Sequence, residues 1–197
     1  MSHSSTVLIV EHEENLAYLF GNWLREQFEI HMAHSGEDAL EIFAEDSIDI
    51  VLLDRRMSGP SGKEALQWIG ERGDSQQVIL MTAVNPTEEL AAIDVDDYLL
   101  RPIDRTKLLR SVEAAELVLT YDDSLTELLS LTARKATLEA NFDYTDPEGT
   151  DQHSSLLQRI RELEEQADTI LQRLEADYKI DMLVRDQRIG SQPLEQL

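Results

Sequence analysis

The stretch Ile48-Asp49-Ile50-Val51-Leu52-Leu53-Asp54 is an apolar run that ends in a carboxylate, and a loop-forming segment, residues 55–62, follows it. Short apolar runs that are bounded by turn residues are typical of strands. Open parallel α/β sheets collect their functional groups at the carboxyl ends of their strands. Asp54 therefore lies where a reactive side chain is expected.

Three further apolar runs end at polar residues. They are residues 7–10, which end at Glu11, residues 78–81, which end at Thr82, and residues 97–100, which end at Arg101. If all four runs are parallel strands, one edge of the sheet receives an acidic cluster, a single carboxylate, a hydroxyl and a cation.

Amphipathic segments alternate with these runs from residue 6 to about residue 119, which indicates an α/β fold with a parallel sheet. Residues 30–34 are a plausible second strand, and Ser35 with two acids opens a second helix. A third helix is expected after Gly62, a short fourth helix between residues 84 and 95, and a fifth near Asp104.

The pattern changes beyond residue 120. One long amphipathic helix is marked by Leu125, Leu128, Leu129, Leu131, Ala136 and Leu138, and residues 142–150 interrupt it with Pro and Gly. A second helix carries a heptad seam at Leu156, Ile160, Leu163, Ala167, Ile170 and Leu174. A single seam cannot bury itself, so it must pack on the first helix, on a second subunit or on both. We predict domains at 6–119 and 120–186, with a flexible tail at 187–197.

Composition narrows the class of protein. The 197 residues carry 40 acidic and 17 basic side chains, a formal net charge of −23, and no cysteine. Such a charge favours a halophilic cytoplasm, where salt screens the repulsion, over an ordinary acidic protein. No clustered positive footprint is visible, so direct nucleic-acid binding is not expected. The first residues lack a basic segment followed by an apolar one and no long apolar run occurs, so neither secretion nor membrane spanning is expected.

The four strand ends resemble the receiver domain of two-component response regulators, and residues 120–186 resemble the HalX domain of haloarchaeal response regulators. The HalX likeness rests on residues 121–122, 127–128, 134–135 and the helix from Leu156 to Asp177. The resemblance implies a flavodoxin-like, doubly wound, five-stranded parallel sheet followed by a helical hairpin. It also implies a signalling protein rather than an enzyme, which accepts a phosphoryl group from a sensor histidine kinase and acts on an unknown downstream protein. We expect a homodimer through the C-terminal helices.

The resemblance assigns Asp54 as phosphoacceptor and gives a Mg²⁺ site made of Glu11, His12, Asp54 and the Arg56 carbonyl. His12 stands where the family has a second acid. Mg²⁺ prefers oxygen ligands, whereas imidazole suits softer transition metals, so Mg²⁺ binding should be weakened or altered. Glu13 is a conceivable substitute, although it lies one residue further along the chain.

The remaining positions match groups that stabilise and report the phosphoryl group. Thr82 corresponds to the hydroxyl that bonds a phosphoryl oxygen, and Tyr98 to the aromatic switch. Arg101 stands where the family has lysine, and it keeps the charge on a planar, forked group. Arg101-Pro102 matches the family's cis peptide bond.

Three functional hypotheses remain open at this stage. The first is a working phosphoacceptor, and the second is a pseudo-receiver that signals through protein contacts alone. The third is a metal-dependent phosphohydrolase with a nucleophilic aspartate, which usually needs a second acid shortly after the nucleophile. Asp54, Thr82 and Tyr98 favour the first, His12 and Arg101 keep the second open, and residues 55–57 offer no acid for the third.

Overall fold

The structure is a computed structural model that describes residues 4–56, 76–83, 95–141 and 147–189. The expected third and fourth helices and residues 190–197 of the expected tail lie outside the described residues. The chain divides into two compact units, residues 1–119 and residues 120–197.

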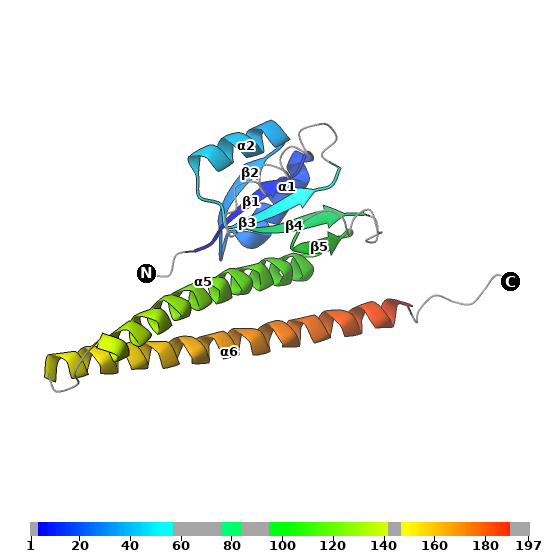
Figure 1. The fold of residues 1–197 in the computed structure, drawn as a ribbon. Helices are drawn as coiled ribbons and strands as arrows, with labels where there is room; N and C mark the ends of the chain where they lie inside the picture. The colour runs from blue at the N-terminus through cyan, green and yellow to red at the C-terminus, as the bar shows by residue number, and fades with distance from the viewer. Residues whose placement is uncertain (1–3, 57–75, 84–94, 142–146, 190–197) are drawn as a thin grey trace. The chain divides into compact units, whose positions relative to one another are not determined.

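The first unit contains a parallel sheet, in the order β2-β1-β3-β4-β5 (Figure 1). Its strands are β1 (Thr6–Val10), β2 (Glu29–Ala33), β3 (Ile50–Asp54), β4 (Gln77–Thr82) and β5 (Asp97–Leu100). Between β1 and β3 the chain changes the direction in which it adds strands, and this switch point is where doubly wound sheets form their sites. The described residues confirm the expected doubly wound, five-stranded fold.

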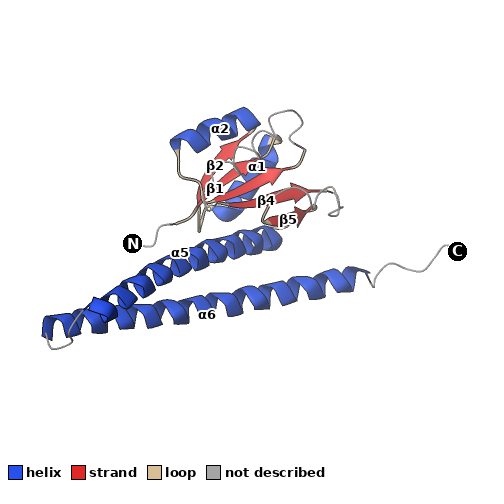
Figure 2. Cartoon of the chain, in the orientation of Figure 1, coloured by secondary structure: helices blue, strands red, loops and turns tan. Residues whose placement is uncertain are grey.

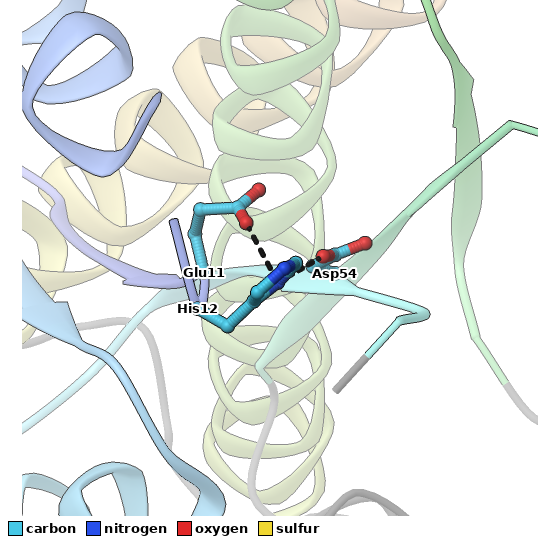
Figure 3. A group of neighbouring side chains, drawn as sticks. All are labelled: Glu11, His12 and Asp54. Atoms are coloured by element: carbon cyan, nitrogen blue, oxygen red, sulfur yellow. Dashed lines mark hydrogen bonds and ion pairs between the residues drawn. The ribbon is translucent and has the colours of Figure 1, made fainter. Parts of the chain in front are cut away.

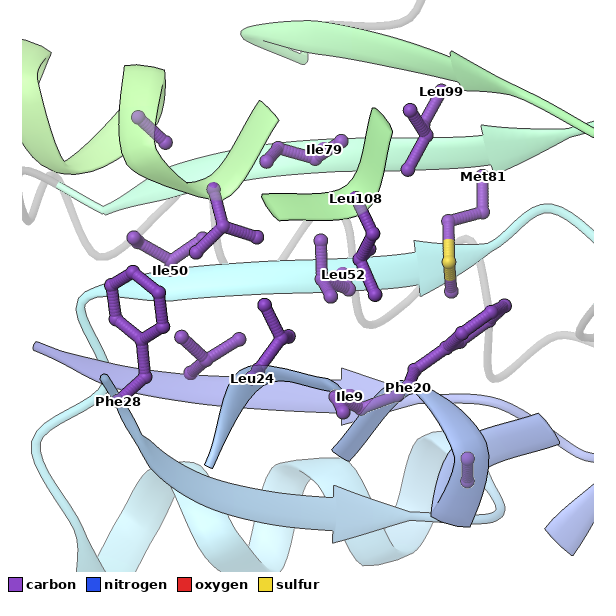
Figure 4. Close-up of a cluster of buried hydrophobic side chains, with 14 residues drawn as sticks. Ile9, Phe20, Leu24, Phe28, Ile50, Leu52, Ile79, Met81, Leu99 and Leu108 are labelled. Atoms are coloured by element: carbon purple, nitrogen blue, oxygen red, sulfur yellow. The ribbon is translucent and has the colours of Figure 1, made fainter. Parts of the chain in front are cut away.

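Helices cover both faces of this sheet (Figure 2). On one face, α1 (Glu14–Leu24) and the first turns of α5 (Arg105–Asn141) bury a cluster of apolar side chains (Figure 4). Its members include Ile9, Phe20, Leu24, Leu52, Ile79, Leu108 and Val112. On the other face, α2 (Gly36–Glu45) packs Ala39 and Phe43 on alternate strand residues such as Leu8, Val51 and Leu80. The strands are thus held between two apolar layers, and their carboxyl ends remain for chemistry.

The helix that begins at Arg105 is longer than the sequence suggested. It continues as α5 to Asn141 through residue 120, where we expected one domain to end and the next to begin. Residues 105–141 contain neither Gly nor Pro, so no residue in this segment interrupts helical hydrogen bonding. Among the described residues, no helix is long and apolar enough to cross a membrane.

In the second unit, the end of α5 pairs with α6 (Pro147–Ile189). Arg159 Nε and Nη2 each donate to Glu127 at 2.8 Å, and His153 lies near Glu139, so the two helices run antiparallel. Five seam residues of α6 are buried: Leu156, Ile160, Leu163, Ala167 and Ile170.

Leu129, on the apolar arc of the first of these helices, is 72% exposed, so this arc is covered only in part. One expectation about the hairpin was wrong. The expected break at residues 142–150 ends earlier, because Pro147 is the first residue of α6. Proline is tolerated there because the first turn of a helix does not need its N–H.

Candidate functional site

Two buried carboxylates meet at the switch point of the sheet. Glu11 directly follows β1 and Asp54 ends β3, and these strands are paired neighbours. Glu11 N–H donates to the Ala33 carbonyl and Arg55 N–H to the Met81 carbonyl, both at 3.0 Å, so the backbone at both sites continues the sheet. The Glu11 side chain is 0% exposed and that of Asp54 is 1% exposed. Carboxylates this deeply buried require compensating partners.

His12 is the first of these partners (Figure 3). Its Nδ1 lies 3.1 Å from Glu11 Oε1 and 3.0 Å from Asp54 Oδ2. Ionised carboxylates only accept hydrogen bonds, so the imidazole tautomer that is protonated at Nδ1 is the one that satisfies this contact. The other ring nitrogen, Nε2, lies 4.0 Å from the exposed carboxylate of Glu13. Glu13 thus lies on the outer side of the imidazole and does not take the place of the missing acid.

Arg101 is the second partner, and it also bridges both carboxylates. Its Nη2 lies 2.5 Å from Glu11 Oε2 and 3.3 Å from Asp54 Oδ1. The backbone of Arg101 is positioned by pairing with the end of β4, since Arg101 N–H donates to the Thr82 carbonyl at 2.8 Å. Within the described ranges, Arg101 Nε is buried and has no hydrogen-bond partner. The peptide bond between Arg101 and Pro102 is cis.

Together these contacts form a ring of four side chains, Glu11, His12, Asp54 and Arg101, in which His12 and Arg101 each contact one oxygen of each carboxylate. Two backbone amides add to it. Glu13 N–H donates to Glu11 Oε1 and Arg56 N–H donates to Asp54 Oδ1, both at 3.1 Å. Each of the four carboxylate oxygens therefore has a partner from the chain itself, which satisfies the charge of the buried pair.

Of the other expected site residues, Thr82 and Arg56 lie at the same edge of the sheet, and Tyr98 lies two residues before the end of β5. Thr82 ends β4 and is buried, one strand away from Asp54. Tyr98 is half-buried in β5 and packs on the apolar cluster beneath α2. The Arg56 side chain is exposed, and its backbone amide contacts Asp54.

The expected metal ligands only partly suit Mg²⁺. Glu11, His12 and Asp54 each offer one donor atom, and these donors lie within 4.8 Å of one another. Two donors are carboxylate oxygens and the third is an imidazole nitrogen. Mg²⁺ demands a near-octahedral shell of oxygens, so this donor set is a poor fit for Mg²⁺ and a better one for ions that accept nitrogen.

His34 is a site neighbour that the sequence did not single out. It follows β2, and its Nδ1 lies 3.0 Å from the Glu11 carbonyl oxygen. The expected second strand included His34, but the described strand ends at Ala33, and the imidazole of His34 contacts the Glu11 backbone. His34 follows the carboxyl end of a strand that pairs with β1, and this position in the sequence could have indicated that it lies near Glu11.

The chain belongs to the response regulator receiver family. The family model for the response regulator receiver domain matches residues 7–113, and the model for the HalX domain matches residues 117–185. The chain thus carries a response regulator receiver domain followed by a HalX domain, as the sequence motifs indicated.

Curated relatives agree with this assignment. A Haloferax volcanii protein, provisionally named a transcriptional regulator, is 32% identical over 158 residues, which are 79% of this chain and 27% of that protein. The regulatory protein AtoC of Escherichia coli K12 is 34% identical over 119 residues, which are 58% of this chain and 26% of AtoC. The chain spans about a quarter of the length of these two relatives.

Solved structures show the same fold in the first unit. The response regulator TrrA of Thermotoga maritima, crystallised in complex with Mg²⁺ and BeF, is 30% identical, with a TM-score of 0.51 over 56% of this chain and 98% of TrrA. A CheY-like receiver domain from Methanospirillum hungatei is 18% identical, with a TM-score of 0.52 over 56% of this chain and 92% of that domain, and it supports the fold alone.

Proposed function

We propose that this protein is a phosphoacceptor of a cytoplasmic two-component system, in which Asp54 takes a phosphoryl group from a sensor histidine kinase. The observation that carries the proposal is the buried carboxylate at the switch point of the sheet, with a hydroxyl and a cation on neighbouring strand ends. In the transfer, an Asp54 oxygen forms a bond to phosphorus while the bond from phosphorus to the donor imidazole nitrogen breaks.

Positioning and charge supply most of the catalysis of phosphoryl transfer, and the described groups can supply both. Arg101 contacts Asp54 and retains a buried Nε–H without a partner among the described residues, a donor that an incoming phosphoryl oxygen would satisfy. We assign to Thr82 the hydroxyl that bonds a second phosphoryl oxygen, and to Tyr98 the switch that responds to it. The signal then passes to the C-terminal helices.

Intact mass spectrometry tests the phosphoacceptor directly. The full chain is incubated with a small-molecule phosphodonor in molar KCl, and the wild type should gain the mass of one phosphoryl group. Asp54→Asn should gain none, because an amide is not a nucleophile for this reaction. Asp46→Asn serves as the matched control, since Asp46 is an exposed residue that pairs with His31, and it should be labelled like the wild type. Equal labelling of Asp54→Asn would refute the assignment.

A second candidate function, a receiver that works without phosphorylation, is favoured by the contacts within the ring of four side chains. Every oxygen of Glu11 and Asp54 already has an internal partner, so neither carboxylate requires a phosphoryl group or a metal ion to compensate its charge. In this case the protein is a pseudo-receiver, a phosphorylation-independent interaction module. Absence of label in the wild type, combined with cooperative unfolding of the same sample, would select this candidate over the first.

We also propose that the C-terminal hairpin serves a second copy of the chain or a downstream protein. The heptad seam is buried within one chain, so the apolar surface left for association lies at exposed residues such as Leu129 and Leu171. Light scattering in molar KCl should show a dimer for the wild type and a monomer for the double variant Leu129→Glu/Leu171→Glu. A wild type that is monomeric at tens of micromolar would leave this surface to a different protein.

A further inference from the structure

The donor atoms of Glu11, His12 and Asp54 have the spacing of ligands that share one ion. His12 Nδ1 lies 3.1 Å from Glu11 Oε1 and 3.0 Å from Asp54 Oδ2. An ion about 2.1 Å from two donors at a right angle separates those donors by about 3 Å. The space between Nδ1 and the two carboxylate oxygens thus suits a small divalent cation.

We infer that this group binds a first-row divalent transition ion, of the class of Mn²⁺, Co²⁺ or Zn²⁺, in preference to Mg²⁺. The reason is the chemistry of the third donor. Imidazole nitrogen is a good ligand for these ions, while Mg²⁺ strongly prefers oxygen and gives up its water reluctantly. The chain has no cysteine, so no thiolate competes for the ion elsewhere.

The rest of the site leaves room for this ion. Arg101 contacts Glu11 Oε2 and Asp54 Oδ1, whereas His12 contacts the other oxygen of each carboxylate. An ion at the imidazole side therefore does not require Arg101 to move. The His12 side chain is 45% exposed, which gives the ion a route from solvent and allows water to fill its remaining positions.

This ion site rests on the proposed function only because Asp54 takes part in both. Ion binding can be measured without phosphorylation, so the two claims can be tested separately. In metal-free full-length protein, the affinities for Co²⁺ and Mg²⁺ are measured by calorimetry in molar KCl, and the visible absorption of bound Co²⁺ reports nitrogen coordination. The variants are His12→Asp, which restores the acid, and His31→Gln. His31 lies 3.5 Å from Asp46 and is a matched control for adventitious surface binding.

In the wild type, Co²⁺ should bind more tightly than Mg²⁺, and His12→Asp should reduce the ratio of the two affinities by about tenfold or more, equivalent to about 1.4 kcal/mol. The Co²⁺ absorption band should change in His12→Asp and be retained in His31→Gln. Circular dichroism of each variant confirms that the fold is intact.

Two results would overturn the inference. One is an unchanged ratio of affinities in His12→Asp, which would mean that His12 does not contact the ion. The other is loss of Co²⁺ binding in His31→Gln alone, which would place the ion on the surface. A protein that is labelled on Asp54 but fails these tests would refute the transition-ion site and leave the phosphoacceptor intact.

Discussion

Replacing Arg101 with methionine should destabilise the first unit by about 3 kcal/mol. Methionine keeps much of the length and the apolar volume of the side chain but removes the guanidinium. Glu11 and Asp54, which are 0% and 1% exposed, would then keep only His12 and two backbone amides as partners. Two buried carboxylates would then remain close together without the guanidinium that lies between them.

The magnitude follows from the burial of the three groups. Removing one partner of a buried ion pair costs about 3–5 kcal/mol, because the other charge stays buried without compensation. Arg101 itself is 18% exposed, so water can enter the space that it leaves, and the lower end of the range applies. With a urea slope of about 2 kcal/mol/M, the midpoint should fall by about 1.5 M.

Urea unfolding in molar KCl is the assay. Both tryptophans, Trp23 and Trp68, lie in residues 1–119, so their fluorescence reports the first unit. The matched control is Arg159→Met, read by circular dichroism, because Arg159 pairs with Glu127 in an exposed setting where ion pairs contribute little.

A double-mutant cycle with Asp54→Asn isolates the contact between Arg101 and Asp54. In the Asp54→Asn background, Arg101→Met should cost clearly less, since one of the two buried charges is already gone. If Arg101→Met is as mild as Arg159→Met, or if the cycle shows no coupling, the ring does not stabilise the fold and this reasoning is wrong.

Three further predictions concern the hairpin and the net charge. Leu163→Ala should lower the free energy of unfolding by about 3 kcal/mol, because Leu163 is only 2% exposed. Leu171→Ala should lower it by less than about 1 kcal/mol, because Leu171 is 40% exposed. Equal changes in the thermal unfolding of the two variants would contradict the described seam. The hydrogen bond from Arg159 lowers the pKa of Glu127 below its ordinary value of 4.5. The ionised carboxylate therefore stabilises the hairpin above pH 4.5, and this stabilisation is lost as the pH falls through the pKa of Glu127 in the folded protein. Glu127→Gln should therefore lose less stability on acidification, as circular dichroism would show. Raising the KCl concentration from about 0.1 M to about 1 M should raise the melting temperature, because the Debye length falls from about 10 Å to about 3 Å around a chain of charge −23. A lower melting temperature would mean that repulsion among the acidic side chains does not limit the stability of the fold.

The sequence by itself determined the sheet and the edge at which the site lies. Apolar runs that end at Glu11, Asp54, Thr82 and Arg101 specify strands, and parallel strands necessarily bring their carboxyl ends to one edge. The heptad spacing likewise specified which face of the second C-terminal helix is buried. These features depend on the local spacing of apolar residues, which can be read directly from the sequence.

Only the tertiary structure decided how the polar groups are paired. Arg101 contacts both Glu11 and Asp54, with the shorter distance to Glu11, and His12 also contacts both carboxylates. The continuity of α5 and the exposure of Leu129 were also decided there. The physical reason is that a buried charge takes whichever partners the packing brings within hydrogen-bond distance, and a strand spacing of about 4.8 Å lets one side chain reach groups on several strands.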